Sequence, residues 1–141
     1  MIAATNKQDN SRFEFIKRSI DITGSVIFLL LFFPLLLITA VLIKIASNGH
    51  IFADIPKRVG RGGKMFRLYK FRSMIVNAHN LMKTDPKFSR LYKKYKESSY
   101  KLHKDPRITK VGKVIRRFSI DEMPQFINVL RVEMSIVGPR A

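Results

Sequence analysis

The longest uncharged run of the chain, from Ile22 to Ile43, restricts the possible fold more than any other feature. As a helix, these 22 residues would measure about 33 Å, enough to cross the hydrocarbon core of a bilayer. A soluble core rarely contains so long an apolar helix. A secretory signal has a shorter apolar stretch that ends at small residues, whereas Lys44 follows this run directly. The run therefore predicts a helical segment inserted in a membrane.

Pro34 lies near the middle of this run and predicts a bend, because proline removes a helical hydrogen bond and clashes with the preceding turn. Basic residues flank the run on both sides, and positive charge favours the cytoplasmic face. A straight span would place one basic group outside, whereas a helix that turns back at Pro34 keeps both groups inside. We therefore favour a re-entrant hairpin over a single span. The flanking residues are Arg12, Lys17 and Arg18 before the run, and Lys44, Lys57, Arg58, Arg61 and Lys64 after it.

The composition indicates one domain of modest core with a strongly cationic surface. The chain has 141 residues, with 27 Lys and Arg against 10 Asp and Glu, which gives a formal net charge of +17. Such a protein is expected to meet a polyanion, an anionic membrane or a phosphate-bearing substrate. The hydrophobic fraction of 46% excludes a disordered polycation, and the absence of Cys excludes disulfides and thiolate zinc sites. His50, His79 and His103 are scattered without the spacing of metal ligands.

The hydropathy pattern divides the chain into three parts. We expect a flexible polar N-terminus over residues 1–12 and a membrane re-entrant helix-break-helix over 13–47. A small cytoplasmic domain, with the catalytic residues if the chain is an enzyme, would follow over 48–141. The predicted fold class is α+β and mainly helical.

Four local patterns predict elements of the third part. The glycines of 58–64 fit a hairpin turn, which we weigh against a phosphate-binding loop, and the alternation over 65–72 fits a half-buried strand. Residues 88–102 fit a basic amphipathic helix, which is typical either of a membrane interface or of an ordinary protein surface. A short helix is expected over 114–117.

Two adjacent carboxylates, Asp121 and Glu122, stand in a stretch rich in arginine, between Arg116 and Arg140. Because acidic residues are few in this chain, the pair indicates a site for a metal ion and a phosphate. Ser119 and Glu122 also have the spacing of a capping box, which would place a helix start here. The two interpretations are equally supported and are compatible, since a helix N-terminus stabilises anions.

Several short motifs follow one another in order along the chain. They are Lys17-Arg18 with Asp21, Pro34, Ile43-Lys44, Arg58-Val-Gly-Arg61 with Gly63-Lys64, Tyr69-Lys-Phe-Arg-Ser-Met74, Asp105-Pro-Arg-Ile-Thr109, Ser119-Ile-Asp-Glu-Met-Pro-Gln125, and Asn128-Val-Leu-Arg131 through Met134-Ser-Ile-Val-Gly-Pro-Arg140. In these motifs, from about Phe13 to its end, the chain resembles the bacterial sugar transferases. These are monotopic phosphoglycosyl transferases that act on polyprenyl phosphate.

The resemblance implies a reaction and its partners. A UDP-sugar would donate its phosphosugar to undecaprenyl phosphate and release UMP, at the cytoplasmic face of the bacterial inner membrane and beside its anionic lipids. This would be the initiating step of exopolysaccharide, O-antigen or glycan synthesis. The resemblance also implies a covalent aspartyl-phosphosugar intermediate on Asp121, with Mg²⁺ held by Glu122 and Asp121. The residues implied to bind phosphates are Lys70, Arg72, Arg116 and Arg140, and those implied to anchor the membrane segment are Lys17, Arg18 and Pro34.

The chain departs from the family pattern in a few places. Phe33 stands where Ser is common, His50 where Pro is common, and Val132 where Gly is common. The chain also stops at Ala141, where family members usually continue, so we expect a C-terminally truncated protein. The alternatives are a non-enzymatic membrane-anchored basic module that binds anionic lipid or nucleic acid, and an inactive remnant. The transferase hypothesis expects no nucleic-acid partner.

Overall fold

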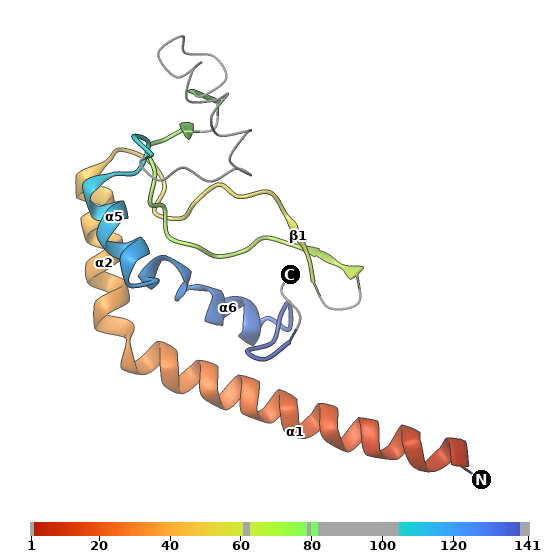
Figure 1. The fold of residues 1–141 in the computed structure, drawn as a ribbon. Helices are drawn as coiled ribbons and strands as arrows, with labels where there is room; N and C mark the ends of the chain where they lie inside the picture. Colours follow the sequence, from red (N-terminus) through yellow and green to blue (C-terminus); the bar gives the residue numbers. More distant parts are fainter. Residues whose placement is uncertain (1, 61–62, 79, 82–104, 139–141) are drawn as a thin grey trace. The chain divides into compact units, whose positions relative to one another are not determined.

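A computed structural model describes residues 2–60, 63–78, 80–81 and 105–138 (Figure 1). The described part is mostly helical and contains one small two-stranded sheet, as the sequence predicted. The amphipathic helix expected over 88–102 lies outside the described residues. The elements in order are α1 (Ile2–Leu31), α2 (Phe33–Ala46), β1 (Arg58–Val59), β2 (Met65–Phe66), α5 (Lys110–Arg117), the 3-10 helix η3 (Ile120–Glu122) and α6 (Gln125–Leu130).

The chain forms two compact units, each built from separate stretches of sequence. The first unit consists of Met1–Leu37, Asp54–Lys70 and Glu122–Ala141, and the second of Ile38–Ala53 and Phe71–Asp121. These two units are defined by contacts between residues. The three parts expected from hydropathy, 1–12, 13–47 and 48–141, stay a prediction.

Helix α1 is drawn from Ile2, while the flexible segment expected over residues 1–12 stays a prediction. Two physical reasons favour the longer helix. Extending an existing helix adds one hydrogen bond for each residue that is fixed, without the cost of a new nucleus. The N-terminal stretch also contains Ala, Lys and Gln, which are strong helix formers.

The predicted bend is confirmed where α1 passes into α2. The helix breaks at Phe32, and the helix axis bends by 62° at this break. Pro34 has no N–H to donate to the carbonyl of Leu30, whereas the bonds Phe32 N to Phe28 O and Leu36 N to Phe32 O remain, at 3.0 and 2.9 Å. No single described helix is long and apolar enough to cross a membrane, but the bent pair together has the required length and composition.

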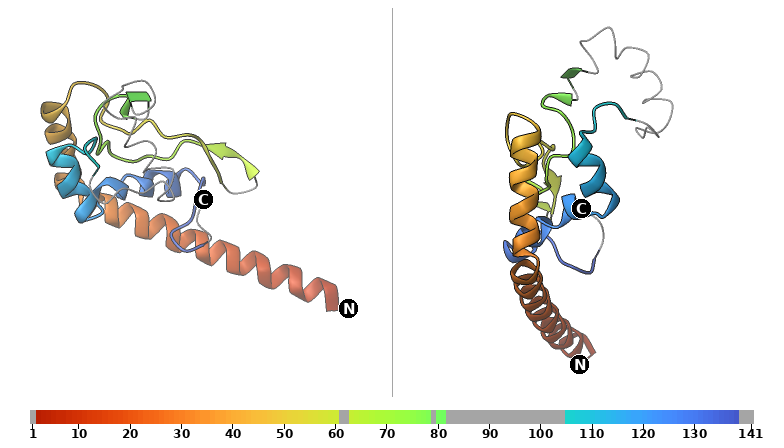
Figure 2. Two further views of the ribbon diagram at one scale, coloured as in Figure 1. Left: turned by 45° about the horizontal axis from the view of Figure 1, so that its top comes forward. Right: turned by 90° about the vertical axis from the view of Figure 1, so that its left-hand side faces the viewer.

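In the first unit, α6 packs along α1 (Figures 1 and 2). Arg18 of α1 donates from Nη1 to Val129 O at 2.7 Å and from Nη2 to Leu130 O at 3.1 Å. The last carbonyls of a helix have no partner within it, and a cation there also complements the helix dipole. Further along α1, the Phe28 ring stacks on the Phe126 ring of α6, with the ring centroids 4.0 Å apart. Arg18 therefore holds the end of α6, a role the sequence did not indicate.

The predicted hairpin over 58–64 is confirmed by β1 and β2, which pair antiparallel with Arg58 opposite Phe66. A Cβ at Gly60 would lie 2.5 Å from the carbonyl oxygen of Glu133, so only glycine fits there. The strand expected over 65–72 is wrong in length, because β2 ends at Phe66.

Beyond β2, the side chain of Asn128 replaces a neighbouring strand. It is fully buried, and its Oδ1 accepts from Tyr69 N at 2.9 Å. Its Nδ2 donates to Arg67 O at 2.8 Å and to Glu133 Oε2 at 2.6 Å. One amide thus satisfies an N–H and a carbonyl of residues 67–69 and fixes this segment against α6.

In the second unit, α5 begins at Lys110, four residues before the predicted start. Thr109 is extended and its Oγ1 accepts from Gly112 N at 2.8 Å, which is the geometry of an N-cap. Gly112 approaches the carbonyl of Ser73 so closely that no Cβ fits between them. The sequence prediction missed both the cap and this contact.

The capping box predicted from Ser119 to Glu122 is wrong. Ser119 has a φ of +56° and closes α5, with its N–H bonded to Arg116 O at 3.3 Å. A residue in this left-handed conformation cannot also adopt the extended backbone of an N-cap. The acid pair therefore lies in the 3-10 turn η3, and α6 starts after Pro124 without a side-chain cap.

Asp105 and Arg107 form a buried ion pair in the turn before α5. Arg107 donates from Nε to Oδ1 at 2.8 Å and from Nη2 to Oδ2 at 2.6 Å, and its backbone N–H also reaches Oδ1. Burial alone would raise the pKa of the Asp105 carboxyl. The hydrogen bonds from Arg107 and the charges of Arg107 and Arg116 outweigh burial, so the pKa is lowered.

Replacing Asn128 with Ala is expected to reduce the free energy of unfolding by about 3 kcal/mol. The substitution leaves three partners unpaired, and each such loss costs about 1–3 kcal/mol where the group is buried. Denaturant unfolding of the protein in detergent micelles, followed by circular dichroism, measures the change. Asn48→Ala is the matched control, because Asn48 is exposed, and it should change stability by less than about 0.5 kcal/mol. Equal effects of the two variants would contradict the assigned role of Asn128.

The Asp105 pair predicts a specific response to acid. The carboxyl has a lower pKa in the folded than in the unfolded chain, so its contribution is complete above about pH 4 and is lost as the pH falls through the folded value. Below about pH 4, wild-type protein should therefore lose stability more steeply than Asp105→Asn. Unfolding at a series of pH values tests this, with the exposed carboxylate variant Asp54→Asn as control. An unchanged acid dependence in Asp105→Asn would exclude the pair as its source.

Candidate functional site

Glu122 and Lys70 form an ion pair inside the first unit. The Lys70 Nζ lies 2.8 Å from Glu122 Oε1, and the side chains are 24% and 44% exposed. Lys70 directly follows the 67–69 segment that Asn128 holds, and Glu122 is the last residue of η3. A partly exposed pair of this kind adds little stability. Its consequence is geometric, because it places an ammonium group beside the second acid of the pair.

Asp121 is described in the second unit, where it is only 3% exposed. Its carbonyl oxygen accepts a hydrogen bond from Phe71 N at 2.9 Å. Phe71 in turn stacks on Phe52, with ring centroids 5.8 Å apart. Within the first unit, Lys70 thus contacts Glu122. Within the second unit, Phe71 contacts Asp121.

The guanidinium of Arg72 is buried and bonded to the end of α2. Its Nη2 donates to Ser47 O at 3.0 Å and to Ser47 Oγ at 2.9 Å. Gly49, with a φ of +124°, lies so close to Nη1 that a Cβ could not be accommodated. Arg72 therefore caps the C-terminus of α2. Its implied contact with a phosphate stays a prediction.

The other cations implied by the resemblance lie in different places. Arg116 is exposed on α5, and its charge contributes to the lowered pKa of Asp105. Arg140 lies outside the described residues. The Lys17 side chain approaches Gly138, whose Cβ, if present, would lie 3.9 Å from Nζ. Lys70, one of the implied phosphate-binding residues, contacts the acid pair through Glu122.

The acid pair offers two carboxylates, a type of ligand that Mg²⁺ takes in proteins. Within residues 2–60, 63–78, 80–81 and 105–138, no three His, Asp or Glu residues converge on a metal site. Mg²⁺ in phosphate-processing sites commonly uses one or two carboxylates and completes its coordination with substrate phosphate and water. Glu122 and Asp121 could supply those carboxylates. Binding of Mg²⁺ by Glu122 and Asp121 stays a prediction.

The sequence prediction missed the structural roles of two buried polar residues, Asn128 and Asp21. Asn128 had a signal in the sequence, because an amide among the apolar residues of a short helix must find buried partners. Asp21, at the edge of the apolar run, had a similar signal. Its carboxylate accepts from Ser135 Oγ at 2.7 Å and from Ile136 N at 3.0 Å, and so ties the segment after α6 to α1.

Similar proteins carry names that point to one chemistry. An Aeromonas hydrophila protein named UDP-N-acetylgalactosamine-undecaprenyl-phosphate N-acetylgalactosaminephosphotransferase is 44% identical over 91% of this chain. A Salmonella typhimurium protein named undecaprenyl-phosphate galactose phosphotransferase is 41% identical over 89%. The exopolysaccharide production protein ExoY of Rhizobium meliloti is 39% identical over 88%.

The length of the match differs between this chain and these relatives. The chain covers 26% of the first two proteins and 54% of the third. The sequence profile described as bacterial sugar transferase matches residues 12–141, which is nearly the whole chain. The chain therefore belongs to the bacterial sugar transferase family.

Proposed function

We propose that this chain provides the acid pair and the membrane segment of a phosphoglycosyl transferase. The reaction would move a sugar phosphate from a UDP-sugar to undecaprenyl phosphate and initiate the synthesis of a polysaccharide. Family membership and the names of the relatives support the reaction class. The observation that carries the assignment to a site is the 2.8 Å pair between Lys70 and Glu122, next to Asp121 in sequence.

In the proposed reaction, an Asp121 carboxylate oxygen attacks the phosphorus that carries the sugar. The bond from this phosphorus to the UMP oxygen breaks, UMP leaves with the bonding electrons, and an aspartyl phosphosugar remains. A phosphate oxygen of undecaprenyl phosphate then attacks the same phosphorus and releases the Asp121 carboxylate. Because Asp121 is almost fully buried, we expect the surrounding chain to open when the donor binds.

The cations have an electrostatic role in this proposal. A carboxylate that attacks a diphosphate approaches like charge, so donors and cations near the phosphoryl oxygens lower the barrier. Lys70 would supply one such cation, and Arg116 and Arg140 would supply others. Mg²⁺ held by Glu122 and Asp121 would neutralise phosphate charge and orient the leaving nucleotide.

The bent pair of α1 and α2 supports insertion in the cytoplasmic leaflet as a re-entrant hairpin. Its exposed surface carries many large apolar side chains. Large exposed apolar surfaces are rare on soluble proteins and are typical of sites that contact a membrane or another protein. A hairpin that enters and leaves by the same face keeps Lys17, Arg18 and Lys44 in the cytoplasm. Apolar side chains exposed around the break are Ile27, Leu30, Leu31, Phe33, Leu37 and Ile38.

Asp121→Asn is expected to abolish both UMP release and covalent labelling of the chain, because an amide cannot form the acyl phosphate. Purified protein in detergent or nanodiscs would be incubated with Mg²⁺ and UDP-sugars radiolabelled in the sugar. Labelled protein is expected to accumulate when undecaprenyl phosphate is omitted and to discharge when it is added. Asp54→Asn is the matched control, since Asp54 is an exposed carboxylate of the first unit.

The outcomes separate the hypotheses. Unchanged UMP release by Asp121→Asn would reject this nucleophile. A wild-type chain that binds membranes but neither releases UMP nor becomes labelled would support the inactive remnant or the basic module. Label on another residue would reject the assignment of Asp121 while keeping the covalent route.

Lys70→Met is expected to lower kcat/KM for the UDP-sugar by about 10²-fold, because one charge that faces the phosphates is lost. Steady-state UMP release measures this change. Lys64→Met removes an exposed charge at the hairpin and should leave kcat/KM within about twofold. Equal values for the two variants would show that Lys70 only pairs with Glu122.

A further inference from the structure

Helix α6 ends in a Schellman motif, a C-terminal turn that two backbone hydrogen bonds close. Val132 N donates to Val129 O at 3.1 Å, and Glu133 N donates to Asn128 O at 3.0 Å. Val132 has a φ of +64°, which is the left-handed conformation that the motif requires at this position. The turn therefore places Glu133 directly beside Asn128.

The side-chain contact across this turn is polar. Schellman motifs frequently carry an apolar contact between these two positions. Here Asn128 Nδ2 donates to Glu133 Oε2 at 2.6 Å. The Asn128 side chain is fully buried, and that of Glu133 is 21% exposed. Since burying a carboxylate costs free energy of desolvation, an apolar pair would close the helix at lower cost. The turn alone does not explain the presence of Glu133.

Glu133 selects the direction in which the Asn128 amide faces. A carboxylate only accepts hydrogen bonds, so the NH₂ group of Asn128 must turn toward it. The amide oxygen is then left to accept from Tyr69 N at 2.9 Å. The carbonyl of Arg67 favours the same orientation, and the carboxylate adds a charged acceptor, which makes the stronger hydrogen bond. In the reverse orientation, Oδ1 would face the oxygens of Glu133 and Arg67.

A second set of contacts leads from Glu133 to the same segment. Its Oε1 accepts from Arg131 Nε at 3.2 Å, and the Arg131 guanidinium lies 5.9 Å from the centre of the Tyr69 ring. The Glu133 backbone also lies against the hairpin, because a Cβ at Gly60 would be 2.5 Å from its carbonyl oxygen. Glu133 is thus connected to the backbone of Tyr69 through Asn128 and to its ring through Arg131.

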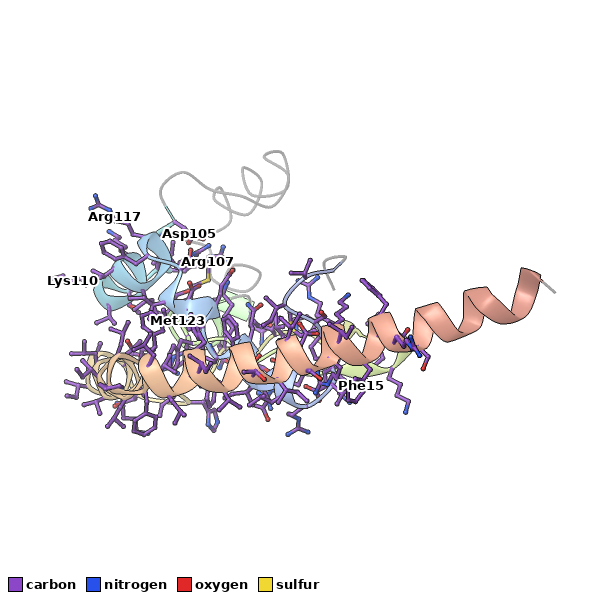
Figure 3. All side chains as sticks on the ribbon, turned by 90° about the horizontal axis from the view of Figure 1, so that it is seen from below. Phe15, Asp105, Arg107, Lys110, Arg117 and Met123 are labelled. Carbon is purple, nitrogen blue, oxygen red and sulfur yellow. The ribbon has the colours of Figure 1, made fainter. Side chains whose placement is uncertain are left out.

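The ion pair at the acid pair is attached to α6 at both ends. Lys70 directly follows Tyr69, and its Nζ lies 2.8 Å from Glu122 Oε1. Met123, labelled in Figure 3, and Pro124 join Glu122 to the start of α6. The distance between Lys70 and Glu122 therefore depends on how residues 67–69 are held on α6.

We propose that Glu133 is a positioning residue of the reaction, which orients the Asn128 amide and thereby holds Lys70 toward the acid pair. Glu133 acts through Asn128 and the backbone of Tyr69, without a contact of its own to the substrate. The proposal rests on the proposed function, because that function assigns the Lys70 charge to the reacting phosphates.

A double-mutant cycle between Glu133 and Lys70 tests the proposal, with kcat/KM for UMP release by the full chain in nanodiscs as the measurement. Glu133→Ala is expected to lower kcat/KM about tenfold, because Lys70 is no longer held in place. In the Lys70→Met background, the same substitution should change kcat/KM by less than about twofold. A smaller folded fraction would instead lower it by the same factor in both backgrounds.

Two further variants isolate the hydrogen bond. Glu133→Gln can still accept from Asn128 through its amide oxygen, so it should keep kcat/KM within about threefold of wild type. Glu14→Ala is the matched control, since Glu14 is an exposed glutamate of α1, and it should stay within about twofold.

A labelling experiment reports the position of Lys70 without turnover. The chain is treated with an acetylating reagent, and mass spectrometry gives the rate at Lys70 relative to that at exposed Lys64. Glu133→Ala should raise this ratio about threefold, because the pair with Glu122 is loosened. Glu122→Gln should raise it likewise, and the two substitutions together should raise it no further. Unfolding would add to the effect of Glu122→Gln instead.

The outcomes distinguish this proposal from the proposed function. Equal losses from Glu133→Ala in both backgrounds, or no recovery in Glu133→Gln, would overturn the positioning role and leave the proposed function intact. A wild-type chain that releases no UMP would contradict the proposed function. The labelling ratio then decides whether Glu133 holds Lys70 on Glu122, and an unchanged ratio in Glu133→Ala would overturn that as well.

Discussion

The buried amide of Asn128 is the interaction on which the first unit depends. It takes the place of a strand partner for residues 67–69, and its Nδ2 also donates a hydrogen bond to Glu133. The helix that carries it is fixed in turn, since Arg18 binds its last carbonyls and packs it on α1. Lys70 directly follows residues 67–69, and Glu122 is separated from α6 only by Met123 and Pro124. Their contact is therefore a consequence of backbone that the amide and the guanidinium have already positioned.

A different polar contact organises the second unit. The Asp105–Arg107 pair closes the turn, Thr109 caps the following helix, and the absence of a side chain at Gly112 allows α5 to reach the backbone of Ser73. Removing one partner of a buried ion pair leaves an unpaired charge, so such pairs tolerate little change. In each unit, backbone hydrogen bonds and buried polar side chains position the segments that contact its acid. In the part of the chain that the structure describes, the large apolar residues that are buried are Ile43, Phe66, Phe71, Ile115 and Val129.

The sequence predicted the features that depend on local pattern. The apolar run and Pro34 predicted the bent pair, and the glycines predicted the hairpin. The prediction failed where a distant partner decides. Ser119 matched a capping box, but closing α5 required the left-handed backbone. Strand β2 is shorter than predicted, and beyond it the side chain of Asn128 from α6 pairs with the backbone in place of a strand. Arg18, implied to anchor the membrane segment, also binds the end of α6. For the acid pair, spacing indicated the residues, whereas the contact of Lys70 with Glu122 required the fold.

The large net charge separates into two groups with different physical roles. Arg72 and Arg107 are buried, and each donates to oxygens of its own unit, so their charges serve the fold. Exposed cations with no acidic neighbour repel one another, and this repulsion persists until an outside anion relieves it. Within the described residues, Lys110, Lys113 and Arg117 belong to this second group. In the proposed reaction, cations of this second group could meet an anionic donor or an anionic lipid.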